Sequence, residues 1–125
     1  MKISAAEWQV MRIVWASGSV GAAEVIEALS ASTNWNHRTI RTLLNRLVAK
    51  GALEAKLDGD RNIFRSRVEQ SQCVQNESRS FIDRVFAGDA GEMLVHLIEN
   101  EEISREQIAQ LKALLNAKRR QEKKR

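Results

Sequence analysis

Several residue types are rare or missing in this sequence of 125 residues. Proline is absent, so no residue of that kind interrupts a helix. The single cysteine, Cys73, cannot form an intrachain disulfide, and no group of cysteines and histidines has the spacing of a zinc site. These absences exclude a disulfide scaffold, predict no metal and no cofactor, and favour the reducing cytoplasm as the location.

Long apolar segments are also missing. The longest stretch without a charged residue, residues 13–23, is interrupted by serines and glycines. We therefore expect neither a signal peptide nor a membrane span. Hydrophobic residues make up 43% of the chain and charged residues 29%, which is ordinary for a soluble folded protein of one or two small domains.

Charge is distributed unevenly along the chain. Residues 1–67 carry ten Lys and Arg against six Asp and Glu, whereas residues 68–117 carry four against nine. The last eight residues, 118–125, carry six against one. A basic first half indicates a polyanionic partner such as nucleic acid. The alternative is that these charges only solvate the surface.

The first half begins with two amphipathic segments. Ser4 and Glu7 have the spacing of a capping box, and the apolar residues after them recur at helical intervals, which predicts a helix that ends near Gly18. A second short helix is expected over residues 22–30, with its apolar residues on one side. These two segments supply core rather than chemistry.

The third segment carries the strongest functional pattern. Asn36 is a good N-cap and Gly51 a good C-terminal stop, and an aliphatic stripe between them has helical spacing. The opposite face holds Arg38, Thr42 and Asn45, with arginines on its flanks. Residues 37–50 include four Lys and Arg and no acidic residue. Such a bias is unfavourable in an isolated helix but suits a phosphate backbone.

A β-hairpin follows the third helix. From Leu53 the apolar residues alternate with polar ones, and Asp58-Gly59 is a strong turn signal before a basic returning strand. Three helices followed by a hairpin have the element order of a winged helix-turn-helix. The sequence therefore predicts a mainly α fold with a small β-hairpin, in which the third helix enters the major groove of DNA.

This arrangement assigns the candidate DNA contacts. The first half of a recognition helix reaches base edges, so the base-reading candidates are Arg38, Thr39, Arg41 and Thr42. Residues at the helix entrance, further along the helix and on the wing are expected to contact phosphate. These candidates are Trp35, Asn36, Arg46, Lys50, Lys56, Arg61 and Arg65. An equal alternative for Trp35 is packing against the second helix.

Four segments carry a family resemblance: WQVMRIVW, EVIEAL, TIRTLLNRLVAKGAL and ESRSFIDRVFAG. They resemble the penicillinase-repressor family (BlaI/MecI), whose relatives include the copper-responsive CopY repressors. The resemblance extends from Ile3 to about Leu115 and is strongest over residues 39–53. It implies a dimeric winged-helix repressor that binds a palindrome with TACA and TGTA arms.

The second half predicts three more amphipathic helices, over residues 70–86 and after the caps Asp89 and Ser104. A fragment of this size buries such apolar faces poorly by itself, so a second copy of the chain is expected to cover them. The alternative is that the helices fold back onto the winged domain. The interface candidates are Phe81, Val85, Phe86, Met93, Leu94, Leu97, Ile98, Ile108, Leu111, Leu114 and Leu115.

These elements predict three parts. Residues 1–68 form the winged helix-turn-helix domain, residues 69–117 the helical dimerisation arm, and residues 118–125 a basic tail. We expect the tail to be a frayed, solvated helix end that complements the helix dipole.

The inducing signal is where the sequence departs from its relatives. The resemblance implies that a membrane sensor-protease system cuts an Asn-Phe bond in β-lactam-responsive members, but His96-Leu97 stands at that place here. The cysteine-rich tail of the copper-responsive members is replaced by basic residues, which excludes copper sensing. Cleavage-controlled repression and repression relieved by another signal both stay open.

Two other function classes were weighed. An enzyme is disfavoured because the two histidines, His37 and His96, lie on different predicted elements and no nucleophile or phosphate-binding motif occurs. A winged-helix module for protein contacts would favour an acidic or apolar outer face on the third helix, unlike the arginines here. The sequence thus predicts a cytoplasmic, dimeric, sequence-specific repressor with double-stranded operator DNA as its partner.

Overall fold

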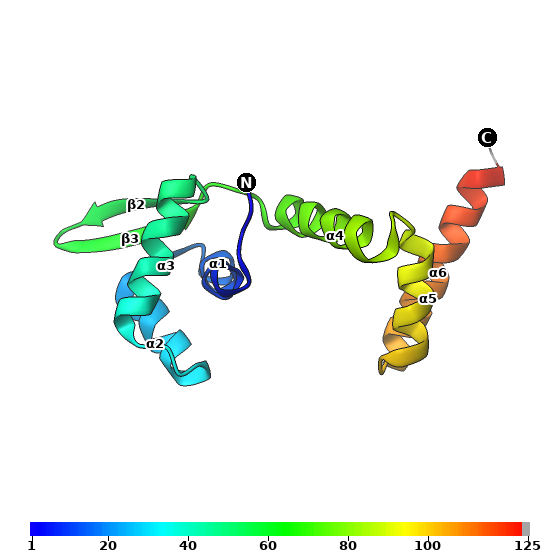
Figure 1. Ribbon diagram of the computed structural model, residues 1–125, viewed down its shortest axis with the longest axis horizontal. Coiled ribbons are helices and arrows are strands. Elements are labelled where there is room, and N and C mark those ends of the chain that lie inside the picture. The colour runs from blue at the N-terminus through cyan, green and yellow to red at the C-terminus, as the bar shows by residue number, and fades with distance from the viewer. Residues whose placement is uncertain (124–125) are drawn as a thin grey trace. The chain divides into compact units, whose positions relative to one another are not determined.

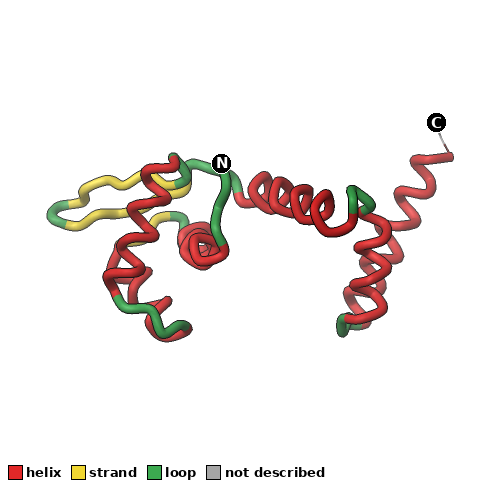
Figure 2. The backbone as a smooth tube through the Cα atoms, in the orientation of Figure 1, coloured by secondary structure: helices red, strands yellow, loops and turns green. Residues whose placement is uncertain are grey.

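The computed structural model describes residues 1–123, which form two compact units that divide between Asn76 and Glu77 (Figures 1 and 2). The elements in chain order are α1 (Ala5–Ser17), β1 (Ser19–Gly21), α2 (Ala22–Ser32), α3 (His37–Lys50), β2 (Leu53–Asp58), β3 (Arg61–Ser66), α4 (Gln70–Phe86), α5 (Ala90–Asn100) and α6 (Arg105–Lys123). The predicted winged-helix fold, mainly helical with a small sheet, is confirmed.

The first unit contains a three-stranded antiparallel sheet in the order β1-β3-β2. Sequence analysis predicted the β2–β3 hairpin but missed β1. The strand has three residues, too few for a visible alternation, and it pairs Val20 with Phe64 of β3. The tip of the hairpin stands free of the helices as the wing (Figure 1).

The core of the first unit lies around α3. Its aliphatic side chains Ile40, Leu43, Leu44 and Leu47 are buried, and the helix contacts α1, α2 and β2. Val10, Met11 and Val14 of α1 and Val25 and Leu29 of α2 cover them from the other side. One face of α3 is thereby fixed inside the unit, and the opposite face is directed outward.

Trp15 ties α1 to the base of the wing. Its indole Nε1 donates to Ser66 Oγ at 3.0 Å and to the carbonyl oxygen of Val68 at 3.2 Å. The ring also packs against Trp8, with 5.6 Å between the ring centroids. These contacts join the first helix to the point where the chain leaves the sheet.

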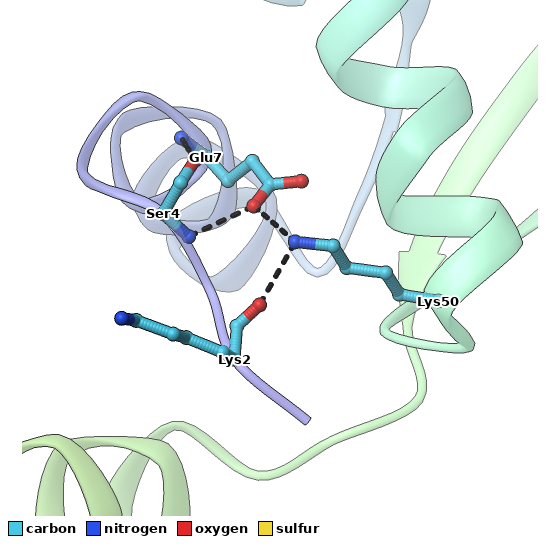
Figure 3. A network of polar contacts seen from close by, with 4 residues as sticks. All are labelled: Lys2, Ser4, Glu7 and Lys50. Carbon is cyan, nitrogen blue, oxygen red and sulfur yellow. Dashed lines mark hydrogen bonds and ion pairs between the residues drawn. The ribbon is translucent and has the colours of Figure 1, made fainter.

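The N-terminus of α1 holds a buried ion pair (Figure 3). The expected capping box is confirmed: Ser4 N donates to Glu7 Oε1 at 2.8 Å, and Glu7 N donates to Ser4 Oγ at 3.2 Å. The same Oε1 accepts from Lys50 Nζ at 2.5 Å, and Lys50 Nζ also donates to the carbonyl oxygen of Lys2 at 2.8 Å. Glu7 is only 1% exposed, so Lys50 compensates a charge inside the protein.

The second unit consists of the end of α4 together with α5 and α6. None of these helices has a fully buried side chain within the described residues. The turn between α4 and α5 uses left-handed backbone at Ala87 and Gly88, and Arg79 stabilises it by donating to Asp83 and to the carbonyl oxygen of Gly88. The capping interactions of Asp89 and Ser104 are present as expected.

Two boundaries differ from those expected. The units divide inside α4 rather than at residue 68, because Val68 and Cys73 pack against the core of the first unit. The segment set apart as a tail is helical as far as Lys123, since nothing in its sequence stops α6. Residues 124–125 of that predicted tail lie outside the described residues.

We predict that Lys50→Met lowers the free energy of unfolding of the first unit by about 2 kcal/mol at pH 7, because it leaves the buried Glu7 carboxylate unpaired. Burial by itself raises the pKa of Glu7, but hydrogen bonds from Lys50 and Ser4 and the charge of Lys50 outweigh it, so the pKa is lowered. The stabilisation is therefore present above the ordinary pKa of 4.5 and is lost as the pH falls through the lowered pKa.

The deficit of the Lys50→Met variant should accordingly shrink at about pH 4, since protonation also relieves its unpaired carboxylate. Urea unfolding followed by tryptophan fluorescence measures it, because Trp8, Trp15 and Trp35 are the three tryptophans of the chain. Lys56→Met, which alters an exposed wing lysine without an ion pair in the described part, is the control. A deficit independent of pH would contradict the role of the pair.

Candidate nucleic-acid interface

The start of α3 is fixed by its cap. Asn36 has extended backbone, and its Oδ1 accepts from Thr39 N at 2.9 Å. At the other end, Gly51 adopts the left-handed conformation with φ of 85° and donates from its N–H to the carbonyl oxygens of Leu47 and Val48. The predicted bounds of the helix are confirmed, and they hold its outer face over almost four turns.

The outer face of α3 is polar and basic. All four base-reading candidates, Arg38, Thr39, Arg41 and Thr42, are exposed, as are Asn45 and Arg46. Thr42 Oγ1 donates to the carbonyl oxygen of Arg38 at 3.0 Å, which holds its hydroxyl against the helix and restrains its side-chain rotamer. The structure therefore brings these residues together on one accessible surface.

The arginines of this face have no internal partner. Within residues 1–123, none of Arg38, Arg41 and Arg46 forms an ion pair, and α3 contains no acidic residue. Unpaired guanidinium groups on one helix face repel one another, and an external anion relieves that repulsion. The face is chemically suited to bind phosphate and the acceptor atoms of base edges.

The wing adds a second basic surface. Strand pairing places Arg65 opposite Glu54 and Lys56 opposite Ile63, so Lys56 and Arg65 share one face of the hairpin. Both side chains are exposed and line a shallow hollow beside Ser17 and Ser19. Neither has an ion-pair partner in the part of the chain that the structure describes.

Arg61 behaves differently from the other wing cations. Its Nη2 lies 2.5 Å from Glu24 Oε1 of α2, so this predicted phosphate contact is engaged by an acidic residue of the same unit. The pair lies over Gly21, where an added Cβ would come within 2.7 Å of Arg61 Nη2. Hydrogen bonds from the backbone amide of Glu24 and from Arg61 hold the pKa of the Glu24 carboxyl below its usual value.

Two further phosphate candidates are also occupied within the unit. Lys50 donates to Glu7 and to the carbonyl of Lys2. Trp35 is half-buried and packs against the core, in keeping with the alternative of packing against neighbouring helices. Sequence reasoning missed Glu7 and Glu24 as partners, since Glu7 and Lys50 are 43 residues apart and Glu24 and Arg61 37 residues apart. Only Gly21, a strand residue without a side chain, was a faint signal.

The remaining chemistry of the described residues is sparse. No group of three or more His, Cys, Asp or Glu side chains in residues 1–123 is arranged to hold a metal ion. Burial raises the pKa of the Cys73 thiol, so it is less readily ionised than a free thiol. Within the same residues, no helix is both long and apolar enough to cross a membrane.

The chain matches the sequence model of the penicillinase repressor family over residues 3–117. It belongs to the penicillinase-repressor family. This confirms the resemblance found in the sequence, and the family is one of transcriptional repressors. Residues 118–125 lie beyond the matched span.

Curated relatives cover almost the whole chain. The chain is 35% identical over 117 residues to the methicillin resistance regulatory protein MecI of Mammaliicoccus sciuri, covering 94% of this chain and 95% of that protein. It is 33% identical over 122 residues to the penicillinase repressor of Bacillus licheniformis, covering 98% and 95%.

Solved structures support the fold of the first unit. The DNA-binding domain of the repressor BlaI in solution is 37% identical with a TM-score of 0.53, over 56% of this chain and 85% of that one. The monomeric form of Bacillus licheniformis BlaI in complex with the blaP half-operator is 37% identical with a TM-score of 0.52, over 57% and 87%. MarR from E. coli, at 18% identity and a TM-score of 0.53 over 92% and 76%, shares the fold.

We predict that Glu24→Gln raises the salt concentration needed to elute the protein from heparin, a polyanion, more than Glu27→Gln does. Both changes remove one negative charge from an exposed position of α2, but only the first releases the Arg61 guanidinium. Elution in a salt gradient measures the difference. Equal shifts for the two variants would mean that the ion pair does not withhold Arg61 from polyanions.

Proposed function

We propose that this chain is a transcriptional repressor that binds operator DNA through the outer face of α3. The observation that carries the proposal is the set of exposed arginines on that face, none of which has an internal counterion in the described residues. The names of its relatives, a methicillin resistance regulator and a penicillinase repressor, support repression of the β-lactam-resistance type. A DNA-bound repressor operates in the cytoplasm of a bacterium.

The proposed division of contacts follows from exposure and position. Arg38, Thr39, Arg41 and Thr42 in the first half of α3 read base edges, with Arg able to donate to guanine O6 and N7. Asn36 and Arg46 on α3, and Lys56 and Arg65 on the wing, contact phosphate. Lys50, Arg61 and Trp35 are left out of this set, because their polar or aromatic groups are used inside the unit.

We further propose that a second copy of the chain covers the second unit. Phe81, Val85, Leu97, Ile98, Ile108, Leu114 and Leu115 are more than a third exposed, and Phe86, Met93, Leu94 and Leu111 are only half-buried. A monomer in water rarely leaves that much apolar surface uncovered. The same surface on both copies forms a two-fold interface.

A two-fold dimer presents two recognition helices to two half-sites, about one helical turn apart. A palindrome with TACA and TGTA arms, as the family resemblance implies, is therefore the proposed operator. This symmetry favours a DNA-binding repressor over a module for protein contacts, which gains nothing from a repeated basic helix. No described cluster of side chains supports a catalytic function.

The inducing signal is proposed only by elimination. His96 and Leu97, which stand where the resemblance places an Asn-Phe cleavage bond, lie inside α5, and Leu97 belongs to the proposed interface. Repression relieved without cleavage at this pair is therefore the version that we propose, and a membrane sensor-protease is not needed as a partner.

We predict that Arg41→Ala weakens binding to a TACA/TGTA palindrome while leaving the thermal midpoint unchanged, because Arg41 is exposed and touches no core residue. The loss is about 1–3 kcal/mol if Arg41 reads a base. Lys56→Ala should weaken binding to the palindrome and to a scrambled duplex alike. Fluorescence anisotropy with both duplexes measures the two effects, and equal losses for both variants on both duplexes would contradict the division.

We also predict that Leu97→Asp yields a monomer that has lost most of its operator affinity, because a charge in an apolar interface has no partner. Sedimentation equilibrium measures the oligomeric state. Val95→Asp is the matched control, since Val95 is an exposed residue of the same helix outside the proposed apolar face. The interface is refuted if the Leu97→Asp protein stays dimeric or if both variants dissociate.

A further inference from the structure

The position of α3 relative to the rest of the first unit depends on more than its aliphatic stripe. Such a stripe fixes which face is inward, but neighbouring aliphatic side chains permit small sliding and rotation of a helix. Directional polar contacts restrict these movements. On α3 such contacts occur at both ends: Asn36 caps the first turn, and Lys50 reaches out of the last turn to α1.

Lys50 is anchored by two acceptors from one short segment. Its Nζ donates to Glu7 Oε1 at 2.5 Å and to the carbonyl oxygen of Lys2 at 2.8 Å, and Glu7 Oε1 also accepts from Ser4 N. Figure 3 shows the ammonium group between Lys2 and Glu7, at the end of α1. The last residue of α3 is thus attached to the start of the first helix, 43 residues earlier.

The contact is strong because Glu7 has few alternatives. Its side chain is 2% exposed, and its second oxygen, Oε2, is buried without a hydrogen-bond partner in the described residues. A buried carboxylate without a counterion is costly, so Glu7 retains the Lys50 ammonium. Lys50, whose side chain is 36% exposed, would have to give up this contact to reach a DNA phosphate.

We propose that Lys50 is a positioning residue, which through Glu7 and the Lys2 carbonyl holds the outer face of α3 at the angle needed for base readout, and that it does not bind phosphate. This inference rests on the proposed function. Arg46, one turn earlier on the same helix, is exposed and has no ion pair in residues 1–123, so it is the contrasting phosphate contact.

The two roles predict effects of opposite sign at Glu7. If charge alone mattered, Glu7→Gln would remove a negative charge near a basic surface and tighten binding to every duplex. If Glu7 positions α3 through Lys50, the same change misaligns the base-reading arginines and weakens only specific binding. A residue with a purely structural role would change stability but not the ratio of affinities for specific and scrambled DNA.

The test uses the full chain and two labelled duplexes, one with a TACA/TGTA palindrome and one scrambled. Dissociation constants of wild type, Glu7→Gln, Lys50→Gln, Arg46→Gln and the double variant Glu7→Gln/Lys50→Gln are measured by anisotropy over a series of KCl concentrations. Circular dichroism first sets a temperature at which each variant used is folded. The double variant removes both charges together, so it keeps the test available if a single variant does not fold.

We expect Lys50→Gln, Glu7→Gln and the double variant each to weaken palindrome binding by about tenfold and scrambled binding by less than about threefold, the size of one misaligned base contact. The double variant should lose no more than the worse single variant, because both changes break one pair. Arg46→Gln should lower the slope of log Kd against log salt by about 0.9, and Lys50→Gln should leave it unchanged.

The proposal is overturned if Lys50→Gln lowers the salt slope as Arg46→Gln does, or if Glu7→Gln binds both duplexes more tightly. Failure of the proposed function looks different. In that case the wild-type protein itself shows no preference for the palindrome, and Arg46→Gln has no effect on the salt slope. The comparison of wild type with Arg46→Gln therefore separates the two failures within one experiment.

Discussion

The first unit depends on the burial of one side of α3. Ile40, Leu43, Leu44 and Leu47 are enclosed by α1, α2 and the sheet, and burial of each such side chain contributes about 1.5–3 kcal/mol. A helix has only two broad faces, so enclosing the aliphatic face forces the other into solvent. The arginines of α3 are exposed for this reason, and the interface is a consequence of the core rather than an addition to it.

The cations of the first unit fall into two groups that composition cannot distinguish. Lys50 and Arg61 have acidic partners on α1 and α2, whereas Arg38, Arg41, Arg46, Lys56 and Arg65 have none in the described residues. The first group joins elements distant in the chain, and the second group stays available to an anion. The separation matters because a buried carboxylate retains its counterion, while an exposed guanidinium exchanges ions freely.

The second unit follows the same logic with a different result. Its helices have apolar faces at helical spacing, but no side chain of α5 or α6 is fully buried within the described residues. A core needs surface from more than one side, and a fragment this small supplies too little of it. The stripe that fixes α3 within one chain thus has its counterpart in a stripe that requires a second copy.

Local sequence determined the elements themselves. The capping residues Ser4, Asn36, Asp89 and Ser104, the Asp58-Gly59 turn and the helical spacing of apolar residues predicted the helices, the hairpin and the outer face of α3, because these signals act within a few residues. Three features were decided only by the tertiary structure: strand β1, the division inside α4, and the pairing of Lys50 with Glu7 and of Arg61 with Glu24. Each joins residues far apart in the chain, and such contacts depend on how the elements pack, which no local spacing encodes.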